Sequence, residues 1–231
     1  MPRLRIDVWS DIACPWCYVG KRHLEQALAE FPEAASVDVV WHAFELNPSA
    51  PREETGNYAE RLAKKYGSSV KEAQSRIDHL VNVAKGDGLA MDFEHIRPGN
   101  TFDAHRVVHY ALEEGRQDAV KERFLRGYLC EGEAIGTHDA VLKLATDAGL
   151  DADKVSSILA SDTYARDVRT DEAEAQRLGI HGVPFFVIGG RYALSGAQPA
   201  ELFGRALRQA WSELAAPVEF AEGAACGPDG C

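Results

Sequence analysis

The sequence predicts an α/β fold with a large helical insertion, and three patterns lead to this prediction. Residues 3–9 alternate apolar and polar side chains as a strand does, and a helix with apolar side chains at helical spacing follows from Cys14. Residues 37–46 are rich in β-branched and aromatic side chains and predict a second strand. Residues 50–176 are rich in Ala, Glu, Lys and Arg, which predicts several consecutive helices.

The C-terminal part supplies the remaining elements of the α/β layer. Two short apolar runs lie on either side of Gly189 and Gly190, which indicates a β-hairpin. A helix is expected over residues 199–214, because apolar side chains recur there along one helical face. The order strand, helix, strand, followed by hairpin and helix, is typical of a single layered α/β core.

These elements predict a chain of three parts. Residues 1–48 and 177–216 form a discontinuous α/β domain, and residues 49–176 form a helical insertion between its two halves. Residues 217–231 form a Gly-rich tail that carries two cysteines in a C-x-x-x-x-C arrangement.

Composition and charge exclude several classes of protein. The chain has 231 residues, of which 45% are hydrophobic and 26% charged, as in a soluble globular protein with a real core. Its net charge of -11 and its lack of a Lys/Arg block argue against a nucleic-acid partner. No apolar stretch approaches the roughly 20 residues of a membrane span, so we expect no membrane partner. Asp7 and Asp11 interrupt any signal-peptide-like run near the start, so we expect a cytoplasmic location.

The motif Cys14-Pro15-Trp16-Cys17 carries the chemistry that the sequence indicates. Pro15 suits the first position of a helix, so the motif opens the helix that follows the first strand. Unpaired N–H groups and the helix dipole favour a thiolate at Cys14, which attacks a partner disulfide, and Cys17 then resolves the mixed disulfide. Trp16 is neutral, so we expect the pKa of Cys14 to be lowered only to about 7, near the thioredoxin end of the range. A C-x-x-C motif beside an α/β pattern is typical of thioredoxin-like redox proteins.

Four segments together resemble DsbA-type oxidoreductases of the thioredoxin superfamily, most closely the FrnE subgroup. They are SDIACPWCYVG, VVWHAFELNP, NTFDAHR and GIHGVPFFVIGGRYALSGAQP. The resemblance implies a thioredoxin-like fold with a large all-helical insertion and a cis peptide bond before Pro184, facing the CPWC motif. The backbone of Val183 is then free to pair with an extended substrate strand beside Cys14, and Pro15 and Trp16 complete the expected substrate-binding residues.

The predicted function is therefore thiol-disulfide exchange with protein substrates, with Cys14 and Cys17 as the catalytic residues. The expected partners are protein disulfides or dithiols and a small-molecule or protein thiol reductant, and no cofactor is required. A cytoplasmic redox poise favours reduction or isomerisation of disulfides, while oxidation remains open. One alternative is a glutathione-dependent isomerase or transferase, of the kappa-class or 2-hydroxychromene-2-carboxylate isomerase type. Such enzymes resemble this fold but carry Ser at the position of Cys14.

The other cysteines leave two hypotheses open. Four turn-forming residues separate Cys226 from Cys231, so a disulfide within the tail is feasible and this pair can serve as a second redox site. Alternatively, both pairs bind zinc in a non-catalytic chaperone or sensor, with four cysteine ligands. Cys130 has no near partner in sequence, and we expect a structural role in packing.

Three polar residues in or after the NTFDAHR segment are weaker candidates for a functional role. His105 and His109 lie one helical turn apart, a spacing that can bind a metal, although packing or hydrogen bonding is the favoured interpretation. The resemblance implies that Asn100 and His105 line the active-site cleft. We therefore predict no metal-binding site.

Overall fold

The computed structural model describes residues 2–215, and these contain a mixed sheet of four strands. The strands are β1 (Leu4–Ser10), β2 (Val37–Ala43), β3 (Phe185–Ile188) and β4 (Tyr192–Ser195), in the spatial order β2-β1-β3-β4. β1 pairs in parallel with β2 and antiparallel with β3, and β3 and β4 form an antiparallel hairpin. The expected α/β layer and its hairpin are thereby confirmed.

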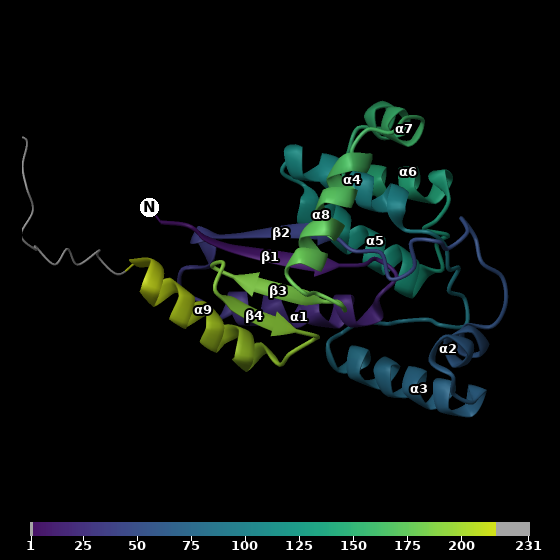
Figure 1. The fold of residues 1–231 in the computed structure, drawn as a ribbon, viewed down its shortest axis with the longest axis horizontal. Helices are drawn as coiled ribbons and strands as arrows, with labels where there is room; N and C mark the ends of the chain where they lie inside the picture. The colour runs from purple at the N-terminus through teal and green to yellow at the C-terminus, as the bar shows by residue number, and fades with distance from the viewer. Residues whose placement is uncertain (1, 216–231) are drawn as a thin grey trace, which may run out of the picture.

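Helices cover both faces of this sheet (Figure 1). α1 (Pro15–Ala29) and α9 (Ala200–Ala215) pack together on one face, where alternate β1 side chains, Leu4, Ile6 and Val8, are buried. α8 (Ala165–Arg177) covers the other face, where its Ala175 forms a second apolar cluster with Trp9 of β1 and with Phe185 and Val187 of β3. The two-residue period of β1 therefore places apolar side chains in both layers.

The helices between β2 and α8 form two groups. α2 (Tyr58–Tyr66) and α3 (Val70–Gly86) pack against each other as a pair, which Figure 1 shows away from α6 and α7 and which contacts α1 through α3. The second group comprises α4 (Phe102–Glu113), α5 (Gln117–Glu131), α6 (His138–Asp147) and α7 (Ala152–Leu159). The expected helical insertion is confirmed, while the domain limits at residues 48/49 and 176/177 stay a prediction.

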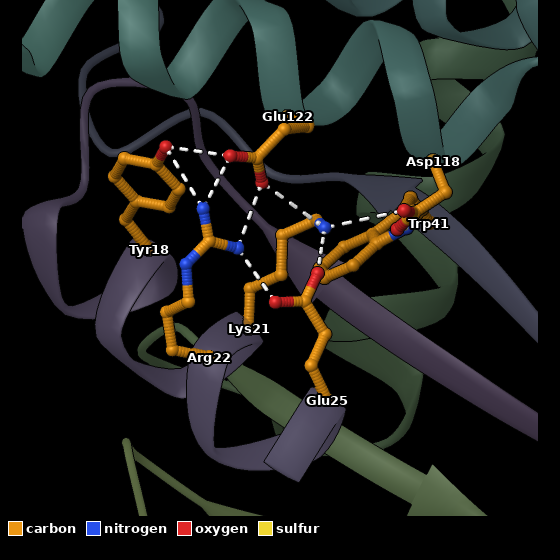
Figure 2. Close-up of polar contacts among 7 residues, drawn as sticks. All are labelled: Tyr18, Lys21, Arg22, Glu25, Trp41, Asp118 and Glu122. Carbon is orange, nitrogen blue, oxygen red and sulfur yellow. Dashed lines mark hydrogen bonds and ion pairs between the residues drawn. The ribbon is translucent and has the colours of Figure 1, made fainter. Parts of the chain in front are cut away.

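Ion pairs and hydrogen bonds join α1 to α5 (Figure 2). Lys21 contacts Asp118 at 3.2 Å and Glu122 at 3.1 Å, and Arg22 contacts Glu122 through both of its terminal nitrogens. We call this network the α1–α5 clamp, and it consists of Tyr18, Lys21, Arg22, Glu25, Trp41, Asp118 and Glu122. Burial opposes ionisation of Glu122, yet bonds from Arg22 and Tyr18 lower its pKa to about 2. The clamp thus holds α5 beside the helix that begins at the CPWC motif.

Candidate functional site: a dithiol at the start of helix α1

Cys14 lies at the turn between β1 and α1, as the motif predicts. It is the N-cap residue of α1, in an extended conformation, and Pro15 occupies the first turn of the helix. The Cys17 backbone N–H donates to the Cys14 carbonyl oxygen at 3.0 Å, so the first helical turn brings the two cysteines together. Both thiols are free, so the structure describes the dithiol form.

The two sulfurs are less accessible than the surrounding motif. The Cys14 side chain is 5% exposed and Cys17 is fully buried, whereas Trp16 is 38% exposed. The Cys14 Sγ donates to the backbone oxygen of Val183 at 3.5 Å, and the Val183–Pro184 peptide bond is cis, as the resemblance implies. The loop before β3 therefore lies directly against Cys14, and of the two sulfurs that of Cys14 is the less buried.

The expectation of a lowered pKa for Cys14 is wrong for this dithiol form. The hydrogen bond with Cys17 and burial both raise the pKa of the Cys14 thiol well above its ordinary value of 9.0. The Cys17 backbone N–H favours the thiolate, but this effect is smaller. Periodicity places Cys14 at a helix N-terminus, but it cannot show how much water the fold removes from the sulfur.

A buried acid, Asp11, lies three residues before Cys14. Its carboxylate accepts from the Leu46 N–H at 2.7 Å and the Ala13 N–H at 3.2 Å, and lies 3.3 Å from His105 Nε2. Burial opposes ionisation of Asp11, but these contacts lower its pKa. Burial lowers the pKa of His105, so the neutral imidazole donates to Asp11. His105 therefore supports the acid beside the motif.

Lys121 is a second buried charged residue near the dithiol. It lies on the buried face of α5 and is 0% exposed, and its Nζ donates to the Ser10 backbone oxygen at 3.1 Å. Burial lowers the pKa of Lys121 to about 8, while Cys17, Asp11 and Cys14 oppose this effect. Sequence reasoning missed this residue, although a lysine among the apolar positions of an amphipathic helix is a signal that periodicity can show.

A cavity of about 590 Å³ opens beside Cys14. Cys14 and Trp16 line it on one side, and residues of α2 and α3 line it on the other. Its lining includes the basic side chains of Arg61, Lys65 and Arg76, and the Arg61 Nη1 atom is buried without a hydrogen-bond partner among the described residues. A cavity of this size can hold a small ligand next to the Cys14 sulfur.

His109 does not join His105 at a shared site. Its Nε2 lies 2.9 Å from Asp171 Oδ2, on the side of α4 that faces α8 and β2. Asn100 donates to Glu45 at 3.3 Å and to the Pro48 oxygen at 3.2 Å. The two histidines thus face different carboxylates, Asp11 and Asp171, and the helical spacing by itself does not bring them onto one ligand.

The remaining cysteines differ in what the structure says of them. Cys130 is partly buried against the main apolar core, and burial raises the pKa of its thiol to about 11, as suits a packing role. Cys226 and Cys231 lie outside the described residues, so their redox role stays a prediction. Within residues 2–215, no helix combines the length and apolar character needed to cross a bilayer.

Known proteins share both the sequence and the fold. Residues 5–208 match the family described as the DSBA-like thioredoxin domain. The uncharacterized protein YwbO of Bacillus subtilis is 28% identical over 208 residues, which cover 88% of this chain and 96% of that protein. The crystal structure of the probable DsbA oxidoreductase SCO1869 from Streptomyces coelicolor is 45% identical, with a TM-score of 0.87 and coverage of 99% and 98% of the two chains.

A more distant structure shares the fold. The cytosolic disulfide reductase DsbM from Pseudomonas aeruginosa, solved with GSH, is 17% identical, with a TM-score of 0.58 and coverage of 91% and 96%. The family match spans the CPWC motif, the helical insertion and the loop before β3, which are the parts that form the site described above. The expected relationship to DsbA-type proteins is thereby confirmed, while the FrnE subgroup stays a prediction, and the chain belongs to the family of DSBA-like thioredoxin domains.

Proposed function

We propose that the protein reduces or isomerises disulfides of protein substrates through Cys14 and Cys17. The observation that carries this proposal is the position of Cys14, which caps a helix with its sulfur against the Val183 carbonyl. Members of this family are oxidoreductases, and a dithiol in one helical turn can form and release a mixed disulfide. Cys14 attacks the substrate disulfide, and the buried Cys17 then resolves the mixed disulfide and releases the substrate.

The substrate-binding residues of this proposal surround Cys14. An extended substrate segment pairs with the backbone at Val183 and Pro184, which lies beside the attacking sulfur. Trp16 and Pro15 offer an apolar surface on the other side, where Trp16 is the exposed part of the motif. Main-chain pairing reads few side chains, so the enzyme accepts a broad range of protein disulfides.

The cavity beside Cys14 supports a small thiol as the reductant. Arg61, Lys65 and Arg76 complement the carboxylates of a molecule such as glutathione, although the protein as a whole is acidic. The glutathione seen with DsbM fits this suggestion. The same cavity also favours the second candidate, a glutathione-dependent isomerase or transferase. A cytoplasmic location, where such thiols keep dithiols reduced, completes the proposal.

The insulin-reduction assay tests the proposed function. Wild-type protein with dithiothreitol should precipitate insulin chains faster than Cys14→Ser, and recovery of scrambled ribonuclease should show the isomerase activity. Glutathione in place of dithiothreitol should also sustain turnover if it is the reductant. Equal rates for wild type and Cys14→Ser in both assays would contradict the proposal. Conversion of a small electrophile by glutathione, unaffected in Cys14→Ser, would favour the second candidate.

The tail pair enters the proposal as a second redox site. Cys226 and Cys231 would pass reducing equivalents to the Cys14–Cys17 disulfide, so a chain truncated after Phe220 should turn over more slowly. The measurement is the steady-state rate of insulin reduction, together with the rate of re-reduction of the Cys14–Cys17 disulfide. Unchanged values for both rates would remove the tail from the mechanism.

A further inference from the structure

Two buried lysines lie at the contact of α1 with α5, and they differ in their partners. Lys21 is 2% exposed and meets three carboxylates of the α1–α5 clamp, those of Glu25, Asp118 and Glu122. Lys121 is fully buried, yet within residues 2–215 it has no carboxylate within 4.0 Å. Its hydrogen bond goes to the Ser10 carbonyl, and its ammonium lies 5.7 Å from the centre of the Trp41 ring.

A buried charge without an opposite charge beside it, such as that of Lys121, lowers the stability of the fold. The clamp completes its ion pairs without Lys121, so the packing of α1 against α5 does not need this charge. An apolar side chain would fit the buried face of α5 better than an ammonium. The charge of Lys121 therefore points to a group whose own charge changes during the reaction.

The groups around Lys121 identify that partner. The Lys121 Nζ binds the carbonyl oxygen at the end of β1, four residues before Cys14, and its α5 neighbours Asp118 and Glu122 contact Lys21, which lies one turn after Cys17 on α1. The charged or titrating groups that act on Lys121 are accordingly Asp11, Cys14, Cys17 and Lys21. From α4, His105 faces it as a neutral imidazole. Asp11 is already held by His105 and two backbone N–H groups. The sulfurs of the dithiol remain as the groups that gain a negative charge.

We propose that Lys121 is a positioning residue whose ammonium is the counter-charge for the Cys17 thiolate that resolves the mixed disulfide. This inference rests on the proposed function, since it concerns the second step of that reaction. Cys17 is fully buried, so water stabilises its thiolate poorly, and a buried positive charge replaces that stabilisation. The helical insertion thus supplies the electrostatics of a cysteine that belongs to the sheet-and-helix core.

Resolution of the mixed disulfide begins at Cys17. The Cys17 thiol releases its proton to solvent, and the Lys121 ammonium stabilises the thiolate that forms. The Cys17 sulfur then attacks Sγ of Cys14, the bond between Cys14 and the substrate sulfur breaks, and the electron pair leaves on the substrate as a thiolate. That thiolate takes a proton from solvent, so the enzyme is oxidised to a disulfide and the substrate is reduced.

The reaction of the reduced protein with 5,5'-dithiobis(2-nitrobenzoate) separates the two steps. Attack by Cys14 releases the first coloured thiolate and resolution by Cys17 releases the second, and stopped-flow absorbance follows both phases. Phases that also occur in a variant carrying both Cys14→Ser and Cys17→Ser belong to the other three cysteines and are subtracted. Absence of the first phase in wild type would count against the proposed function itself. The inference about Lys121 concerns the second phase alone, measured between about pH 6 and pH 10.

Two matched variants test the inference. In Lys121→Met the second phase should slow at least about tenfold at pH 7 and its pH midpoint should rise, because the thiolate loses its counter-charge. Lys21→Met removes the other buried lysine at the same contact and should keep the wild-type midpoint. An unchanged midpoint in Lys121→Met, or an equal rise in Lys21→Met, would overturn the inference.

A measurement that leaves Lys121 in place covers the case in which Lys121→Met does not fold. Coupling between two charges is reciprocal, so the Cys17 thiolate must in turn raise the pKa of Lys121. Carbon-13 NMR of the lysine side chain should therefore show a lower pKa for Lys121 in Cys17→Ser than in reduced wild type. Equal values in the two proteins would contradict the coupling.

Discussion

In a Cys17→Ser variant, we expect turnover to fall at least about a hundredfold and a covalent complex with the substrate to accumulate. Cys14 still attacks the substrate disulfide, because its cap position and its contact with Val183 do not depend on the Cys17 sulfur. The serine hydroxyl cannot displace the substrate sulfur. The enzyme is therefore held at the mixed disulfide until an external thiol releases it.

The measurement is non-reducing electrophoresis followed by intact mass of the complex. Cys14→Ser should form no such complex, and dithiothreitol should dissolve the complex of Cys17→Ser. Cys130→Ser is the matched control, because this thiol is partly buried with a pKa raised to about 11, and its removal should leave turnover at the wild-type value. A complex that forms equally well with Cys14→Ser would assign the attack to another cysteine.

Asp171→Asn should lower the free energy of unfolding by about 3–5 kcal/mol, because the change breaks a buried charge cluster. The Asp171 carboxylate lies 2.7 Å from His42 Nδ1 and 2.9 Å from His109 Nε2, and it accepts from the Ala43 N–H at 2.7 Å. These contacts tie α8 and α4 to β2 beneath the site. Urea unfolding at neutral pH measures the cost, and Asp167→Asn, an exposed change on the same helix, should cost little.

The same cluster makes stability depend on pH in a defined direction. Burial opposes a charge on His42, but hydrogen bonds with Asp171 and Asp7 raise its pKa from 6.5 to about 9. The stabilisation is therefore complete below pH 6.5 and is lost as the pH rises through about 9. The raised pKa of His42 corresponds to a contribution of about 3 kcal/mol to the free energy of unfolding.

Acid has the opposite effect on Asp171. Burial opposes its ionisation, but contacts with His109 and His42 lower the pKa of Asp171 below its ordinary value of 3.8. Its contribution is thus present above that pH and is lost on acidification. Wild-type unfolding curves should show both losses, and the alkaline loss should shrink in Asp171→Asn. A wild-type curve that is flat from pH 6 to about pH 10 would contradict the assignment to His42.

The match between sequence and structure depends on how local each feature is. The start of α1 at Pro15 follows from the motif itself, and the alternation in residues 3–9 follows from contacts along one strand. The burial of the Cys14 sulfur depends on the loop before β3, which is distant in sequence. The raised pKa of Cys14 thus combines a local cause, the hydrogen bond with Cys17, with burial that depends on this distant loop, and helix geometry alone does not give its direction.

The burial of charged residues likewise cannot be predicted from the local sequence. Asp11, Lys121 and Asp171 are hydrophilic, and a sequence pattern assigns such residues to the surface. The two acids are buried with partners from other elements: Asp11 has His105 from α4, and Asp171 has His42 from β2. Lys121 has only the Ser10 carbonyl of β1 as its hydrogen-bond partner among the described residues. Among these three, Lys121 alone leaves a trace in the sequence, as a lysine among apolar helical positions.

By itself, the sequence determined the order of strands and helices along the chain, the helix that begins within the CPWC motif, and the redox chemistry of the two thiols. Those features depend on residue spacing and on backbone preferences within a few residues. Only the tertiary structure decided that the Cys14 sulfur is buried against the Val183 carbonyl, that a cavity opens beside it, and that Lys121 is buried on the Ser10 carbonyl at the end of β1. The physical reason is that desolvation and charge compensation act through space, between segments that are up to 169 residues apart along the chain.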